Sequence, residues 1–140
     1  MRALFLIQGE GRGHLTQALS LAQMLRIAGH EVLGAVVGVT AERDVPAFFS
    51  EAFSAPITPI FSPGLVYNAG TNALEPFKTT IQAIQNIRPL WKSLKQVHHI
   101  IETQRPDVVV NFYEMLGGLT YALLRPSVPM VCIAHQYMVF

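Results

Sequence analysis

The segment best suited to chemistry is Gly9-Glu10-Gly11-Arg12-Gly13-His14, in which glycines alternate with ionisable side chains. It follows a short apolar run, residues 2–7, and precedes residues with helical spacing that start at Leu15. Glycines let a ligand approach the backbone closely, and the free N–H groups at a helix start favour negative charge. The segment is therefore typical of a strand-to-helix turn that binds an anion or a polar ligand. The same glycines could also form only a tight turn.

Two common nucleotide-binding loops do not match this segment. A phosphate-binding loop of the Gly-x-x-x-x-Gly-Lys type fails because His14 occupies the position of the second glycine and no lysine follows it. The dinucleotide fingerprint Gly-x-Gly-x-x-Gly matches at Gly9 and Gly11, but its third glycine is again replaced by His14. Its acidic residue is also missing, since Glu42 and Asp44 lie in a predicted loop rather than at a strand end. The interpretation of this chain as half of a nicotinamide-dependent oxidoreductase is therefore disfavoured, although it stays an alternative.

Alternating strands and helices would position this segment. Apolar and β-branched runs predict buried strands, and Leu and Ala at i, i+3 and i+4 predict helices. Gly29 stands where the first helix should end with a C-terminal cap, and Pro89 marks a kink or a new first turn in the third helix. Predicted strands cover residues 2–7, 31–39, 57–61, 108–111 and 130–134, and predicted helices cover residues 15–28, 46–53, 77–103 and 116–124. The alternation predicts a single α/β domain over residues 1–140, with a Rossmann-like parallel sheet covered by helices on both faces.

A second group of polar residues follows the predicted strand at 108–111. In a sheet of strand order 3-2-1-4-5, ligands bind at the carboxyl ends of the strands, where the order reverses between strands one and four. This topology places Asn111 and Glu114 beside the glycine segment as candidate ligand contacts. Glu114 could equally serve only as the first residue of the following helix. No metal site is expected, because His98 and His99 point about 100° apart on a helix and no other spacing fits metal ligands.

The predicted helix at 77–103 is unusual in its charge. The sequence has no acidic residue between Glu75 and Glu102. Its basic side chains fall within about 60° of one another on a helical wheel, opposite an apolar stripe: they are Arg88, Lys92, Lys95 and His99. This pattern predicts either a solvated helix face or a basic face for anionic lipid or a phosphorylated ligand.

The composition excludes several classes of protein. Of the 140 residues, 51% are hydrophobic and 14% are charged, which excludes intrinsic disorder. The formal net charge of +1 does not favour a nucleic-acid partner. Cys132 is the only cysteine, and the apolar run at residues 3–7 is too short for a signal-peptide core or a membrane span, so a cytoplasmic location is expected. The mean hydropathy of +0.35 indicates apolar surface that docks against a partner.

Two motifs give the chain a family resemblance. Gln8-Gly9-Glu10-Gly11-Arg12-Gly13-His14-Leu15-Thr16-Gln17-Ala18 and Gly29-His30-Glu31-Val32 resemble the first loop and helix of GT-B glycosyltransferases. The nearest branch contains the peptidoglycan lipid-intermediate N-acetylglucosaminyltransferase and the monogalactosyldiacylglycerol synthases. Val131-Cys132-Ile133-Ala134-His135-Gln136-Tyr137 resembles a later strand and loop, where the branch carries His-Glu-Gln-Asn and only Gln136 matches.

The resemblance implies the N-terminal, acceptor-binding half of an inverting transferase that moves a sugar from a nucleotide-sugar to an acceptor hydroxyl. His14 would be the general base, since a neutral imidazole with an ordinary pKa of about 6.5 can accept a proton at physiological pH. A helix N-terminus would favour the neutral form, although a histidine that only caps the helix is the alternative. Candidate substrate-binding residues lie in the glycine segment, at or just after the end of the predicted strand at 108–111, and in the last of the resembling segments: Gly9, Glu10, Gly11, Arg12, Gly13, Asn111, Glu114 and Gln136. Glu10 could also only complement the helix start, and Arg12 could only be solvated.

The resemblance also implies that the domain binding the donor is not in this chain. We expect either a truncated protein, which the stop at Phe140 just past a predicted strand favours, or one subunit of a split transferase. No cofactor is expected apart from the nucleotide-sugar, which is a substrate. A peripheral membrane contact through Arg88, Lys92 and Lys95 is a further expectation. The main alternative is a non-catalytic module of the same fold that binds an anionic ligand or recruits a partner subunit.

Overall fold

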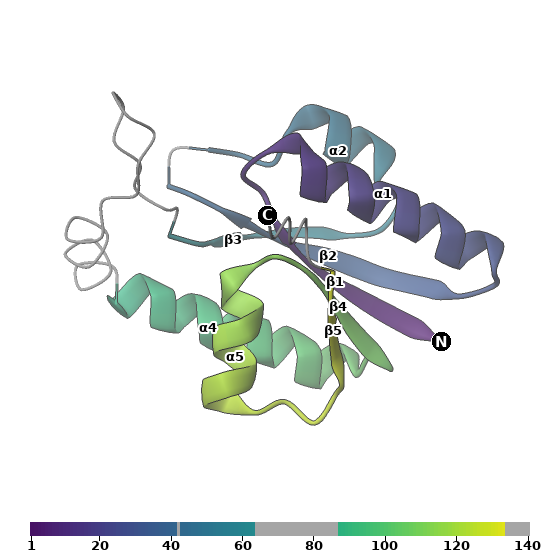
Figure 1. Cartoon of the computed structure of the whole chain (residues 1–140). Helices are drawn as coiled ribbons and strands as arrows, with labels where there is room; N and C mark the ends of the chain where they lie inside the picture. Colours follow the sequence, from purple (N-terminus) through teal and green to yellow (C-terminus); the bar gives the residue numbers. More distant parts are fainter. Residues whose placement is uncertain (42, 64–86, 134–140) are drawn as a thin grey trace, which may run out of the picture.

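The computed structural model describes residues 1–41, 43–63 and 87–133. Its centre is a five-stranded parallel sheet of order β3-β2-β1-β4-β5 (Figure 1). The strands are β1 (Arg2–Gln8), β2 (Glu31–Val39), β3 (Ile57–Phe61), β4 (Val108–Phe112) and β5 (Met130–Cys132). The predicted fold class and strand order are confirmed, so the reversal of strand order lies between β1 and β4.

The helices cover both faces of this sheet. Helices α1 (Arg12–Ile27) and α2 (Ala47–Ala52) lie on one face, and α4 (Ile87–Gln104) and α5 (Met115–Leu124) lie on the other (Figure 1). Side chains of β1 alternate between the two resulting cores: Phe5 and Ile7 pack toward α1, whereas Leu4 and Leu6 pack toward α4. Both faces of β1 are buried, which explains why its sequence is a continuous apolar run rather than an alternating one.

Helix α1 begins at Arg12, earlier than the start at Leu15 that apolar spacing predicts. Arg12 and Gly13 are exposed, so the apolar pattern cannot detect the first turn. Gly11 precedes the helix with φ 94°, in the left-handed region that only glycine adopts readily. At the other end, Gly29 has φ 78°, which confirms its predicted role in ending the helix.

Helix α4 exposes the predicted basic face and buries the opposite one. Its buried residues are Ser93, Leu94, Val97 and Ile101. Arg88, Lys92, Lys95 and His99 are exposed, and Pro89 lies in the first turn of the described helix. The earlier part of the helix predicted at 77–103, residues 77–86, lies outside the described residues. None of the described helices is long and apolar enough to cross a membrane.

Candidate functional site

The turn after β1 packs tightly against the end of β2. The N–H of Gly9 donates a hydrogen bond to the carbonyl oxygen of Gly38 at 2.9 Å. A Cβ atom at Gly9 would lie 2.5 Å from that oxygen, so a side chain there would push the two strands apart. Glycine at position 9 therefore holds the start of α1 at the carboxyl edge of the sheet, where parallel α/β folds bind ligands.

His14 lies in the first turn of α1, half-buried, and contacts a residue from another part of the chain. Its imidazole stacks on the ring of Tyr113, with 5.7 Å between the ring centroids and 7° between the planes. Tyr113 follows β4 and is 60% exposed. The structure therefore brings the predicted base to the switch point between β1 and β4, under an aromatic ring that covers one of its faces.

Tyr113 reaches His14 because the backbone after β4 turns sharply. Its φ is 59°, which costs a non-glycine residue about 1–2 kcal/mol. The buried side chain of Asn111 closes this turn with two hydrogen bonds to the backbone of Glu114: Oδ1 accepts from the N–H at 2.8 Å, and Nδ2 donates to the carbonyl at 3.0 Å. Asn111 is thus a positioning residue for Tyr113. Tyr113 was missed by sequence reasoning, because nothing in a tyrosine side chain signals a left-handed backbone.

Glu114 is 3% exposed and begins α5. Its Oε1 accepts hydrogen bonds from Ser62 Oγ at 2.8 Å and from the N–H of Leu116 at 3.1 Å. Glu114 therefore is the helix-start residue that sequence reasoning offered as an alternative. Burial raises the pKa of its carboxyl above 4.5, and the charge of Glu10 acts in the same direction.

A cavity of about 440 Å³ opens beside these residues. It is lined by residues from the ends of β1, β4 and β5 and from the start of α5, including Gln8, Asn111, Tyr113, Glu114 and Ile133. Its volume lies within the range of small-molecule sites. The structure thus places Asn111 and Glu114 in the wall of one cavity, with Tyr113 joining that cavity to His14.

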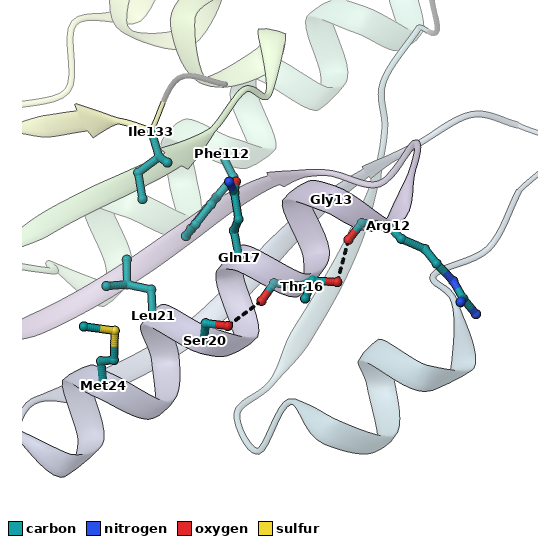
Figure 2. A pocket seen from close by; sticks show the side chains of 9 residues that line it. All are labelled: Arg12, Gly13, Thr16, Gln17, Ser20, Leu21, Met24, Phe112 and Ile133. Atoms are coloured by element: carbon teal, nitrogen blue, oxygen red, sulfur yellow. Dashed lines mark hydrogen bonds between the residues drawn. The ribbon is translucent and has the colours of Figure 1, made fainter. Parts of the chain in front are cut away.

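A second, more open hollow of about 540 Å³ runs along α1 and ends at Phe112 and Ile133 (Figure 2). Two hydroxyl groups on this helix are occupied by its own backbone, since Thr16 donates to the carbonyl of Arg12 and Ser20 to that of Thr16. The side chain of Arg12 points away from the other residues of the hollow (Figure 2).

Not every predicted site residue joins the cavity. The guanidinium of Arg12 lies over the ring of Phe48, 5.1 Å from its centroid, so it is directed toward α2 and not toward the cavity. Gln136 lies outside the described residues. Among residues 1–41, 43–63 and 87–133, no three His, Cys, Asp or Glu side chains are grouped in a way that could hold a metal ion.

Solved structures share this architecture. MurG of Acinetobacter baumannii has a TM-score of 0.61 and 21% identity, with 94% of this chain and 34% of that chain covered. The glycosyltransferase SnogD from Streptomyces nogalater has a TM-score of 0.53 and 29% identity, with coverages of 95% and 33%. A hydrogenase C-terminal domain from Pyrococcus furiosus has a TM-score of 0.60 at 12% identity, with coverages of 94% and 90%, so a likeness at such low identity shows the fold alone.

The predicted resemblance to the N-terminal domain of a GT-B glycosyltransferase is confirmed, and this chain spans about a third of the length of the two glycosyltransferases. A comparison with curated protein sequences found no match. The sequence profile of glycosyl transferase family 1 matches residues 1–140. The match covers the turn, the sheet and every described residue of the site. The chain therefore belongs to glycosyl transferase family 1.

Proposed function

We propose that this chain is the acceptor-binding half of an inverting glycosyltransferase that moves a sugar from a nucleotide-sugar donor to an acceptor hydroxyl. The observation that carries the proposal is the position of His14. Its imidazole lies at the switch point of the sheet, stacked on Tyr113, which also lines the 440 Å³ cavity. An acceptor in this cavity would place its hydroxyl within reach of an oriented base.

In this proposal the reaction is a single displacement. The imidazole of His14 takes the proton of the acceptor hydroxyl while the oxygen attacks the anomeric carbon of the donor sugar. The bond from that carbon to the nucleotide phosphate breaks, and the configuration inverts because attack and departure occur on opposite faces. A positioned general base typically accelerates such a step by about 10²–10⁴-fold.

The donor requires a second domain under this proposal. The glycosyltransferases of similar structure have chains about three times as long as the part that this chain matches. We therefore propose a donor-binding domain, either downstream in the same polypeptide or in a companion subunit, with no metal and no cofactor besides the donor substrate. We also propose a cytoplasmic location, with peripheral membrane contact through the basic face of α4.

The test is His14→Ala in the complete two-domain protein. We expect turnover to fall by about 10²–10⁴-fold, while the apparent affinity for donor and acceptor changes far less, because the lost interaction belongs to the transition state. The acidic limb of the pH–rate profile should also disappear, since that limb would report protonation of His14.

His30→Ala is the matched control, because His30 lies at the opposite end of α1 from the site. A histidine that only caps the helix predicts a stability loss of about 1 kcal/mol with turnover per folded molecule almost unchanged. If His14→Ala melts early but turns over normally, the proposed base is wrong and Glu114 becomes the next candidate. Turnover of a nucleotide-sugar by the 140-residue chain alone would contradict the proposed need for a donor domain.

A further inference from the structure

The side chain of Glu114 is longer and more deeply buried than a residue that only caps a helix needs to be. Serine, asparagine or aspartate caps a helix well, whereas a buried glutamate must lose its hydration. Room for this side chain comes from β2, where a Cβ atom at Gly38 would collide with Glu114 Oε2. A shorter capping residue would need neither the burial nor the glycine. The second carboxyl oxygen, Oε2, therefore calls for its own explanation.

The hydrogen bonds of Glu114 distinguish its two oxygens. Oε1 accepts from both Ser62 Oγ and the N–H of Leu116. Oε2 is buried and has no hydrogen-bond partner among the described residues. Because Oε1 already accepts two hydrogen bonds, the carboxyl proton is best placed on Oε2, which then becomes a hydrogen-bond donor. The raised pKa of this carboxyl, caused mainly by burial, agrees with a protonated state.

Glu114 also lines a small cavity of about 20 Å³. Its lining includes Gly38, which approaches Oε2, together with Glu10 and Gln8. Such a volume holds about one water molecule or one polar atom of a ligand. It shares Gln8, Ser62, Pro63 and Glu114 with the 440 Å³ cavity, so the small cavity forms the polar end of the larger one.

The described residues that line the rest of the larger cavity carry no positive charge. Among the described residues of its lining there is neither lysine nor arginine, and the apolar side chains of Pro63, Tyr113, Met115 and Ile133 form much of it. The guanidinium of Arg12 lies over Phe48 instead. The charge of Glu10, which acts to raise the pKa of Glu114, is negative. A phosphate here would lose its hydration without gaining a cation.

We infer that the 440 Å³ cavity binds an uncharged, largely apolar acceptor that places a hydroxyl or carbonyl oxygen on Oε2 of Glu114. That the ligand is the acceptor rests on the proposed function, whereas its chemical class rests on the cavity alone. The inference also assigns the basic face of α4 to a different task, because the acceptor needs no cation.

The test uses naphthol and naphthyl phosphate, which share one apolar ring system and differ in charge. Carbon-13 NMR of the 140-residue chain follows the side-chain carboxyl signals during titration with each probe. Naphthol should shift the Glu114 signal saturably and leave that of Glu51, an exposed residue on α2, unchanged. Naphthyl phosphate should bind at least about tenfold more weakly, because its charge stays uncompensated. Equal or tighter binding of the phosphate, or no saturable shift at Glu114, would overturn the inference.

Two variants test the anchoring oxygen. Glu114→Gln keeps both an acceptor oxygen and a donor group, so naphthol affinity should stay within about twofold of the parent. Glu114→Met has similar length but neither group, and should bind naphthol about tenfold more weakly. Unchanged affinity in a folded Glu114→Met would overturn the role of Glu114. If this variant does not fold, the carbon-13 titration of the parent chain still decides whether naphthol binds at Glu114.

The outcomes separate this inference from the proposed function. Naphthol binding at Glu114 in a complete protein that transfers no sugar would contradict the proposed function and leave the ligand class intact. Sugar transfer by a complete protein whose cavity prefers naphthyl phosphate would contradict the ligand class and leave the proposed function intact.

Discussion

The site is built from residues in states that their side-chain types do not favour. Tyr113 has a left-handed backbone, and Glu114 is a buried carboxyl. Each state costs free energy, and each is held by a neighbour: the amide of Asn111 closes the turn around Tyr113, and Ser62 and Leu116 donate to Glu114. Strain that is held in place by specific contacts is common at functional sites.

The stacking of Tyr113 on His14 should matter for turnover. Tyr113→Phe keeps the ring, whereas Tyr113→Asn removes it with a residue that tolerates the left-handed backbone. In the complete enzyme we expect Tyr113→Asn to lower turnover by up to about tenfold, because an aromatic pair is worth about 0.5–1.5 kcal/mol. Tyr113→Phe should stay close to the parent. Steady-state kinetics and melting curves check both, and equal turnover in the two variants would contradict a positioning role.

The raised pKa of Glu114 makes stability depend on pH. The folded chain holds this proton more tightly than the unfolded chain, whose carboxyl has the ordinary pKa of 4.5. The free energy of unfolding should therefore decrease as pH rises from 4.5 to the raised pKa, and should level off above it.

Glu114→Gln cannot titrate, so its melting temperature relative to the parent should increase across the same pH window. Glu51→Gln is the control, because Glu51 is exposed. Thermal melts at a series of pH values measure the difference. Parallel profiles of melting temperature against pH for Glu114→Gln and the parent would show that burial does not raise the pKa of Glu114.

At the scale of elements, the junction between β4 and α5 carries the site. The buried Asn111 is the second-to-last residue of the strand, Glu114 starts the helix, and two hydrogen bonds between them fix the turn that presents Tyr113. Helix α5 approaches β4 closely because it has glycines in its first two turns. A Cβ atom at Gly117 would lie 2.6 Å from Nδ2 of Asn111, whereas one at Gly118 would have no atom within 4 Å.

These adjacent glycines give a matched pair of variants. Gly117→Ala should displace the Asn111 amide and lower the free energy of unfolding by about 1–3 kcal/mol. Gly118→Ala should raise it by about 0.5–1 kcal/mol, because alanine favours a helix interior. Urea unfolding of the two variants measures both changes. Equal effects would mean that α5 does not depend on close packing against Asn111.

At the scale of the molecule, the two faces of the sheet carry different surfaces. One face is covered by α1 and α2, and the other by α4 and α5, where α4 presents its basic face (Figure 1). Beside that basic face, Ile87 and Trp91 are 62% and 42% exposed, and Lys95 Nζ lies 5.9 Å from the centroid of the Trp91 ring. Basic and aromatic side chains together suit the surface of an anionic membrane.

Loss of basic charge from α4 should weaken binding to anionic vesicles. Each lysine near such a surface contributes about 1 kcal/mol, so Lys92→Gln combined with Lys95→Gln should reduce sedimentation with phosphatidylglycerol vesicles at low salt. Salt should weaken the binding of the parent as well. Arg26→Gln combined with Arg43→Gln removes the same charge outside α4 and should bind like the parent. Equal loss in both double variants, or no binding by the parent, would favour a merely solvated face.

The sequence by itself determined the elements, the sheet order and the place of the candidate site. Hydrophobic periodicity is local, so it located the strands and the buried faces of α1 and α4 to within a few residues. The alternation of strands and helices then restricted the topology to a doubly wound sheet, and this topology placed Gly9–His14 beside Asn111 and Glu114. The exposed first turn of α1 was not predicted, because it carries no apolar signal.

The tertiary structure alone decided which contacts each side chain of the candidate site makes. The stack of His14 on Tyr113 joins two turns that are far apart in the sequence, and the bond from Ser62 to Glu114 spans 52 positions. Arg12, which the sequence offered as a substrate contact or a solvated residue, lies with its guanidinium over Phe48 on another helix. These contacts depend on which distant side chains share a cavity and on a left-handed backbone that tyrosine does not signal. Local spacing contains neither kind of information, so the fold could be predicted where the roles of its residues could not.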